Sequence, residues 1–378
     1  MNTQNMYLYH QNTVEKKFLL SLKVFITMRK FILMERKLHT DRMVTQIFYV
    51  DTEGLLKYEA QNEIRVIARN SDQPNSRWYS GTGIYRPVYL WTGDQKYIPV
   101  NGIRIHTVSY APAVIEVEIK TSCPGTVKVE ILDKNQIVLT QEVENTGHPS
   151  VLRMEIPDAK LWDCDHPNLY TLRATFGEDV VEETFGIRLL EWNPEKGLTI
   201  NGKREILRGA CVHHDNGVLG ACTYPEAEER RVRILKENGY NAIRSSHYPC
   251  SKDMLDACDR QGMLMMDEYV DVWYIHKTKY DYAGYLNEWW QQDLKDMVEK
   301  DYNHPCVIMY SIGNEIPEVG NSIDSGWGEK TGGPDPCAGP DQICDQFHES
   351  AAGRYGHAVK DDSGRTGTGS EYRRTAIR

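Results

Sequence analysis

The sequence of 378 residues lacks several features that would mark common protein classes. It has no apolar run near the ~20 residues that a membrane-spanning helix needs, so we expect no membrane partner. It also lacks an excess of basic residues, because its formal net charge is −10. We find no basic stripe interleaved with aromatics and no zinc-finger or RNP pattern. These absences argue against nucleic acid and anionic membrane surfaces as partners.

The nine cysteines are an odd number and show no CxxC spacing, so we expect neither a disulfide framework nor a zinc site. This usage fits a reducing compartment. The segment from Lys16 to Met34 weakly resembles a signal peptide, but Lys23, Arg29 and Lys30 interrupt its apolar middle. No small-residue cleavage site follows it. We therefore interpret it as an ordinary or damaged N-terminal segment, and we expect a cytoplasmic location.

The first part of the chain, residues 1–97, predicts a partial β-sandwich. Residues up to about 45 show neither alternation nor helix caps, so they support no assignment. From Glu63 to Arg69 polar and apolar residues alternate, as in a half-buried strand. The stretch from Gly81 to Trp91 is a glycine-containing turn followed by another strand. Together these features indicate the end of a β-sandwich.

Residues 98–188 predict a second all-β domain, an immunoglobulin-like sandwich. Short apolar runs recur there, separated by turn residues such as Cys123 to Gly125. Nothing in this region suggests chemistry. The expected strands are Ile103–Thr107, Val114–Lys120, Val127–Leu132, Ile137–Val143, Leu152–Ile156, Tyr170–Phe176 and Val180–Ile187.

From residue 189 onward, strand-like runs alternate with helical ones, which predicts part of a (β/α)8 barrel. We expect helices to begin at Thr223, at Ser251 and near Leu286. The first two helices should end at Gly239 and Gly262. After about residue 320 the pattern becomes irregular. The four expected strands are Glu205–His214, Asn241–Ser246, Met263–Met266 and the run that ends before Gly313.

Each of these strands ends in polar groups, which is where the catalytic residues of a barrel lie. The four strand ends carry His213 and His214, then Arg244 and His247, then Asp267 and Glu268, and finally Asn314 and Glu315. A single histidine at a strand end is more often structural than functional. An alternative is that Arg244 and Asp267 make an internal ion pair that only holds strands together. Four polar endings in register favour an active site.

The same stretches resemble glycoside hydrolase family 2. The motifs in the barrel region are LRGACVHHDNGVLG, NAIRSSHYP, MMDEYVDVW and HPCVIMYSIGNE. GTGIYRPVYLW resembles the end of the family's N-terminal sugar-binding domain, and LWDCDHPNLYTL with FGIR resembles the close of its immunoglobulin-like domain. The HHD and SSHYP motifs are most similar to those of the β-galactosidase branch. β-Glucuronidases share much of both motifs, so galactoside and glucuronide both stay open as substrates.

The resemblance implies retaining hydrolysis of a β-galactoside, with two carboxylic groups about 5–5.5 Å apart. Glu315 matches the general acid/base, which a negative neighbour and partial burial would keep protonated. Asn314 matches the residue that hydrogen-bonds the sugar 2-hydroxyl. The resemblance makes the histidines substrate-binding residues and places Arg244 and Asp267 to orient the catalytic carboxylates. The predicted substrate-binding set is His213, His214, Arg244, His247, Asp267 and Asn314.

The chain also departs from the family pattern. The nucleophile should be a Glu after a later strand, yet none of the four Glu residues beyond Glu315 (Glu318, Glu329, Glu349 and Glu371) closes an apolar strand. Some relatives bind magnesium near the acid/base through acidic and His residues after the third strand. Val272 and Tyr274 stand in the matching region here, so we expect no cofactor. A half barrel would expose strand edges, which predicts poor solubility or association, including a homo-oligomer. The alternative to an enzyme is a non-catalytic carbohydrate-binding module.

Overall fold

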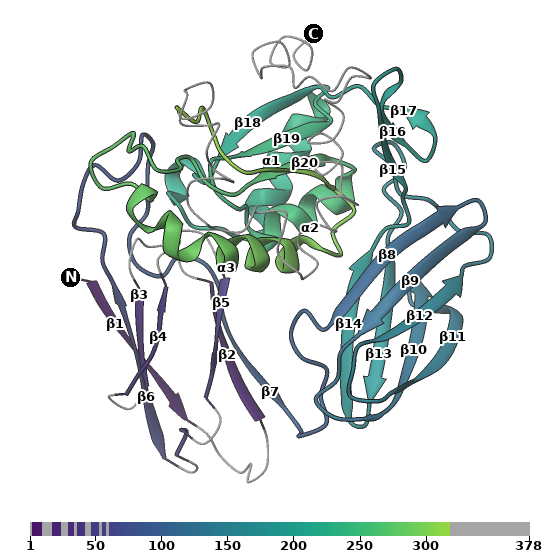
Figure 1. Ribbon diagram of the computed structural model, residues 1–378, viewed down its shortest axis with the longest axis horizontal. Coiled ribbons are helices and arrows are strands. Elements are labelled where there is room, and N and C mark those ends of the chain that lie inside the picture. Colours follow the sequence, from purple (N-terminus) through teal and green to yellow (C-terminus); the bar gives the residue numbers. More distant parts are fainter. Residues whose placement is uncertain are drawn as a thin grey trace, which may run out of the picture.

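The computed structural model describes residues 2–9, 17–23, 29–33, 36–41, 47–52, 55–57 and 60–317, with side chains from residue 48 onward except at residues 61, 90, 92 and 93. These residues form two β-sandwiches and a parallel sheet with helices on its face (Figure 1). Two sandwiches followed by a partial parallel barrel is the predicted fold class. Among the described residues, no helix has the length and apolar character needed to cross a membrane.

The first sandwich consists of two antiparallel sheets. Its strands include four before residue 45, where the sequence pattern supported no assignment. Strand β6 corresponds to the alternating segment at Glu63 and strand β7 to the strand expected after Gly81. One sheet has the order β1 (Asn2–Tyr9), β6 (Gln61–Ala68), β3 (Arg29–Leu33) and β4 (Arg36–Asp41), and the other has the order β5 (Ile47–Asp51), β2 (Lys17–Lys23) and β7 (Val88–Gly93).

The second sandwich contains all seven strands expected from the sequence, each shifted by no more than a few residues. Burial alternates strictly along β9 and β13, because every second side chain faces the core between the sheets. Its sheets have the orders β11 (Gln136–Asn145), β10 (Gly125–Asp133), β13 (Tyr170–Phe176), β14 (Asp179–Phe185), and β12 (Ser150–Glu155), β9 (Ala113–Ile119), β8 (Ile103–Tyr110).

A small sheet of β15 (Leu190–Asn193), β16 (Gly197–Ile200) and β17 (Lys203–Arg204) leads into four parallel strands that follow one another in chain order. We call these four strands and their helices the half-barrel. Its elements are β18 (Gly209–His213), a short 3-10 helix (Gly217–Leu219), α1 (Pro225–Glu237), β19 (Ala242–Ser246), α2 (Lys252–Gln261), β20 (Leu264–Glu268), α3 (Ala283–Asp301) and β21 (Val307–Ser311).

The ends of the half-barrel elements test the sequence signals directly. Ser251 caps α2 as predicted, since its hydroxyl accepts a hydrogen bond from the backbone N of Met254 at 3.1 Å. Gly262 ends α2 in the left-handed conformation, where a Cβ would lie 2.5 Å from the carbonyl oxygen of Cys164. The prediction for α1 was wrong by one residue, because Tyr224 and not Thr223 precedes its first turn. The first strand begins four residues later than expected, at Gly209.

The FGIR motif that closes the second sandwich fixes this sandwich to the half-barrel. Arg188 is buried and donates hydrogen bonds to the carbonyl oxygens of Pro305 at 2.5 Å and Val307 at 2.6 Å. Burial lowers the pKa of its guanidinium to about 10. A Cβ at Gly186 would lie 2.8 Å from the Cβ of Trp162, so only glycine fits there. These contacts hold the start of β21 in place and so help to position the site at its end.

Candidate active site

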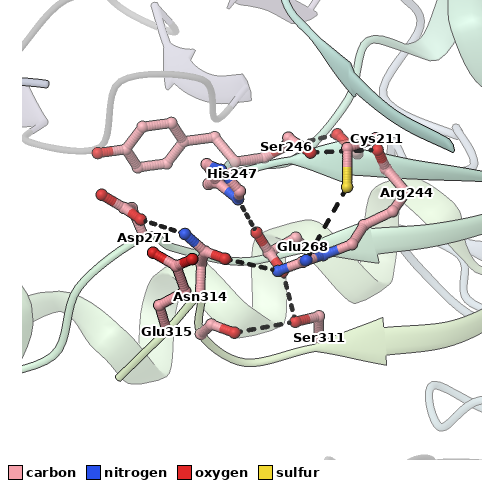
Figure 2. Close-up of polar contacts among 12 residues, drawn as sticks. Cys211, Arg244, Ser246, His247, Glu268, Asp271, Ser311, Asn314 and Glu315 are labelled. Atoms are coloured by element: carbon pink, nitrogen blue, oxygen red, sulfur yellow. Dashed lines mark hydrogen bonds and ion pairs between the residues drawn. The ribbon is translucent and has the colours of Figure 1, made fainter. Parts of the chain in front are cut away.

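Glu268 is the centre of a hydrogen-bond network at the carboxyl ends of the parallel strands (Figure 2). Its side chain is fully buried at the end of β20. It accepts hydrogen bonds from Arg244 Nε at 2.8 Å and from Ser311 Oγ at 2.6 Å, and it contacts His247 Nδ1 at 2.6 Å. A buried carboxylate is stable only with such partners. Glu268 therefore joins three strand ends, those of β19, β20 and β21.

Asn314 follows β21 and is fixed on both sides of its amide. Its Oδ1 accepts from Arg244 Nη2 at 3.0 Å, and its Nδ2 donates to Asp271 Oδ1 at 2.8 Å. Lys277 Nζ also donates to Asp271 Oδ1, at 3.0 Å. Burial alone would raise the pKa of Asp271, but the hydrogen bonds from Asn314 and Lys277 lower it below its usual value. The amide thus has one orientation, and one of its two N–H groups remains for a ligand.

Glu315, the predicted acid/base, differs from the expectation in its surroundings. Its backbone has a φ of +43°, and its side chain is 68% exposed. Its nearest charged partner is a cation, because both terminal nitrogens of Arg77 lie 3.3 Å from Glu315 Oε2. Glu315 therefore has neither the negative neighbour nor the partial burial that we expected.

An aromatic wall lies beside this network. The ring of Trp78, from the loop before β7, lies 5.3 Å from the ring of His213 and 5.1 Å from that of His247. The two histidine rings meet edge to face at 5.2 Å. Burial, followed by the charge of His247, lowers the pKa of His213. We expect His213 to be neutral near pH 7, so that it offers a ring face and a hydrogen-bonding nitrogen to a ligand.

Two predicted site residues, His214 and Asp267, point away from the site. His214 Nε2 contacts the carbonyl oxygen of Tyr248 at 2.8 Å inside the protein. Asp267 accepts from the backbone N of Cys250 at 2.8 Å and from Lys300 Nζ of α3 at 3.3 Å. The Arg244–Asp267 ion pair does not form. Neighbouring residues of a strand face opposite sides of a sheet, so Glu268 faces the site and Asp267 faces the helices.

The structure adds Arg77, Trp78, Glu268, Asp271 and Lys277 to the site. Strand alternation identifies Glu268, since Arg244 pairs in register with Met266, two residues before it. Asp271 and Lys277 lie in the loop after β20, where the barrel pattern places functional groups. No pattern in the sequence connects Arg77 and Trp78 with strand ends more than 130 residues away.

The described residues near the site do not fit a magnesium ion. Arg77 and Lys277 both contact Asp271 Oδ1, and their charges would repel a divalent cation. Among the described residues, Asp256, Asp259 and His304 form a group with metal-ligand spacing behind the sheet. Lys252 Nζ lies 3.2 Å from His304 Nε2, so a cation is already present there. The absence of a cofactor stays a prediction.

Comparison with known proteins identifies the family. Residues 101–188 match the family described as glycosyl hydrolases family 2, and residues 194–325 match the family 2 TIM barrel domain. The chain belongs to glycoside hydrolase family 2. These two matches cover more than half of the chain. They confirm the predicted family and the predicted fold class.

Named relatives and solved structures agree with this assignment. A β-galactosidase of Bacteroides ovatus is 38% identical over 290 residues, covering 72% of this chain and 34% of that protein. A β-glucuronidase of Bacteroides fragilis is 28% identical over 311 residues, covering 73% of this chain and 44% of that protein. A family 2 structure from Bacteroides cellulosilyticus matches with a TM-score of 0.80 and 33% identity, covering 85% of this chain and 44% of its own. The chain thus spans less than half the length of these relatives.

Proposed function

We propose that the carboxyl ends of β18 to β21 bind the sugar of a β-galactoside and that Glu315 is the general acid/base of its retaining hydrolysis. The observation that carries this proposal is the network from Glu268 through Arg244 and Asn314 to Asp271, which fixes Asn314 directly before Glu315. Such positioning groups are costly to bury and serve little purpose in a purely structural sheet.

The free hydrogen-bonding positions suit a sugar. One N–H of Asn314 remains for a sugar hydroxyl, as its other N–H donates to Asp271. His247 contacts Glu268 through Nδ1, which leaves Nε2 to face a ligand. Trp78 offers an apolar face beside them, and aromatic faces stack on the C–H faces of sugar rings. The site therefore combines the polar and apolar contacts that a hexose needs.

In the proposed reaction, the carboxylic acid of Glu315 gives its proton to the glycosidic oxygen as the bond to the anomeric carbon breaks. A second carboxylate attacks that carbon from the opposite face and forms a glycosyl-enzyme ester. Glu315, now ionised, takes a proton from water, and the hydroxide so formed displaces the carboxylate and releases the sugar. The family resemblance places the second carboxylate after a later strand than β21, beyond the described residues.

One observation favours a second candidate function, non-catalytic sugar binding. Glu315 is exposed and lies beside Arg77, so it has neither the partial burial nor the negative neighbour expected of a general acid. The sugar also has an alternative, since a relative named β-galactosidase and one named β-glucuronidase both match this chain. In that alternative a β-glucuronide replaces the β-galactoside, and Asn314 and Glu315 keep the same roles.

Hydrolysis of 4-nitrophenyl β-galactoside and 4-nitrophenyl β-glucuronide tests these proposals. The parent chain is compared with Glu315→Gln and with Glu226→Gln, an exposed glutamate of α1 that serves as the matched control. Loss of turnover in Glu315→Gln alone supports the acid/base role, and the faster substrate identifies the sugar. Binding of galactose without turnover by folded protein, weakened in Asn314→Ala, would favour the non-catalytic function. Neither turnover nor binding would exclude both.

A further inference from the structure

A second cavity lies away from the candidate active site, where the two sandwiches meet the outer face of the half-barrel. Its volume is about 530 Å³, within the usual range of ligand pockets. Strand β7 of the first sandwich, β14 of the second and helix α2 of the half-barrel each line part of it. None of its lining residues belongs to the Glu268 network or to the aromatic wall around Trp78. The cavity therefore needs its own explanation.

One wall of the cavity is aromatic. Tyr89 and Trp91 are two residues apart on β7, so their side chains leave the same face of the strand. Their ring centroids are 6.4 Å apart, and half of the Trp91 side-chain surface remains exposed. Tyr89 and Trp91 thus form a paired exposed aromatic surface, unlike apolar side chains scattered singly, which are normal on any protein. They offer flat apolar faces of the kind that stack on sugar rings.

The other walls are acidic. Asp253 and Asp256 belong to the first turns of α2, and Glu183 comes from β14. Burial raises the pKa of Glu183, while its side chain remains at the cavity wall. Asp256 Oδ1 lies 3.5 Å from Lys252 Nζ and 3.8 Å from His304 Nδ1. Carboxylate oxygens are hydrogen-bond acceptors only, so they suit ligands that present several hydroxyl donors.

The charge of the lining limits the class of ligand. Six carboxylates line the cavity, against three Lys and Arg side chains and His304. One of these cations, Arg260, bonds outward to Glu229 at 2.6 Å. An anionic ligand would meet net repulsion in such a site, and uronic acids and phosphates are therefore disfavoured. A neutral ligand rich in hydroxyl groups fits both the acidic and the aromatic walls.

We propose that this cavity is a second carbohydrate site, which binds a neutral oligosaccharide by stacking on Trp91 and Tyr89 and by hydrogen bonds from sugar hydroxyls to Asp253 and Asp256. Because β7 and α2 lie in different parts of the chain, the ligand also connects the first sandwich with the half-barrel. The proposal goes beyond hydrolysis at Glu315 and does not depend on it, since no residue is shared between the two sites.

The test is isothermal titration of the full chain with three neutral trisaccharides (β-1,4-galactotriose, cellotriose and xylotriose) and with trigalacturonate as the anionic probe. We expect at least one neutral trisaccharide to bind and trigalacturonate not to bind. Trp91→Ala and Tyr89→Ala should each weaken that binding about tenfold or more, whereas Trp91→Phe should retain most of it. Val151→Ala, at an exposed apolar side chain of β12, is the matched control that should bind like the parent.

Two further variants separate this site from the candidate active site. Trp78→Ala removes the aromatic wall beside Glu268 and should leave trisaccharide binding at the cavity intact. Trisaccharide binding that is lost in Trp78→Ala but kept in Trp91→Ala would overturn the proposal. So would trigalacturonate that binds more tightly than the neutral trisaccharides, or folded protein that binds none of the trisaccharides. Melting temperatures identify variants that fail to fold, and the Tyr89→Ala and Trp91→Ala pair gives two independent tests. Hydrolysis at Glu315, if present, should be unchanged in Trp91→Ala.

Discussion

Arg77 of the first sandwich lies 3.3 Å from the carboxylate of Glu315 at the end of the half-barrel. The same guanidinium donates to Asp271 Oδ1 at 3.1 Å, so it connects the predicted acid/base with the group that orients Asn314. The first sandwich therefore contributes a charged residue to the site and is more than a neighbour of the catalytic domain.

We predict that Arg77→Gln leaves the free energy of unfolding within about 1 kcal/mol of the parent, because ion pairs that water reaches contribute little. The side chain of Arg77 is 41% exposed and that of Glu315 is 68% exposed. Buried Asp271 keeps its hydrogen bonds from Asn314 and Lys277 in the variant. Urea denaturation measures the effect, with Arg77→Lys as the charge-preserving control. A loss of more than about 2 kcal/mol in Arg77→Gln would show that the pair is shielded from water and carries part of the interdomain stability.

The buried pair of Glu268 and Arg244 should behave in the opposite way. Glu268→Leu leaves the guanidinium of Arg244 beside an apolar side chain, and we expect a loss of about 3–5 kcal/mol. Adding Arg244→Met should recover part of this loss, because the unpaired charge is then removed. The measurement is a double-mutant cycle by urea denaturation, with an expected coupling of at least about 1 kcal/mol. Additive losses would contradict a direct interaction.

Much of the fold could be predicted because the signals are local. Alternation along Tyr170 to Phe176 matches β13 residue for residue, and the Ser251 cap and the Gly262 end of α2 lie where the sequence places them. The strands before residue 45 could not be predicted. Their sequences carry no clear period, and β1 pairs with β6 across more than 50 residues of chain.

The candidate site was predicted in part, for a physical reason that the adjacent residues Asp267 and Glu268 illustrate. Sequence places both at the end of the third strand, but the pleat sends them to opposite faces, and only Glu268 meets Arg244. Arg77 and Trp78 could not be predicted, since their contacts depend on how the first sandwich packs on the half-barrel. Site residues that come from a distant domain leave no local pattern.

The opposite faces of β20 give a prediction that separates stability from binding. Asp267→Asn should lower the free energy of unfolding by about 1–3 kcal/mol, because buried Lys300 loses one of its two carboxylate partners and keeps Asp301. Its affinity for galactose should stay at the parent value. Asn314→Ala should weaken galactose about tenfold and lower the free energy of unfolding by about 1–2 kcal/mol, since Arg244 and Asp271 each lose one of several partners. Titration calorimetry and urea denaturation of both variants provide the two readouts. Weakened binding in a fully stable Asp267→Asn would place Asp267 in the site after all.

His214 should make the stability of the chain depend on pH. Burial, followed by the positive charge of Arg86, lowers the pKa of His214 to about 3 in the folded protein. In the unfolded chain its pKa is about 6.5. Between these values the unfolded state binds a proton that the folded state does not, so stability falls as the pH drops from about 6.5 toward 3, by up to about 1.4 kcal/mol per unit. Above pH 6.5 both states are neutral and the contribution disappears.

His214→Gln removes this titration and keeps a side-chain N–H that can reach the carbonyl oxygen of Tyr248. We expect the loss of stability between pH 7.5 and pH 5 to be about 2 kcal/mol smaller in this variant than in the parent. Urea denaturation at both pH values measures it, and His148→Gln, in an exposed turn, serves as the control that should titrate like the parent. An identical pH dependence in all three proteins would mean that His214 takes up its proton while folded.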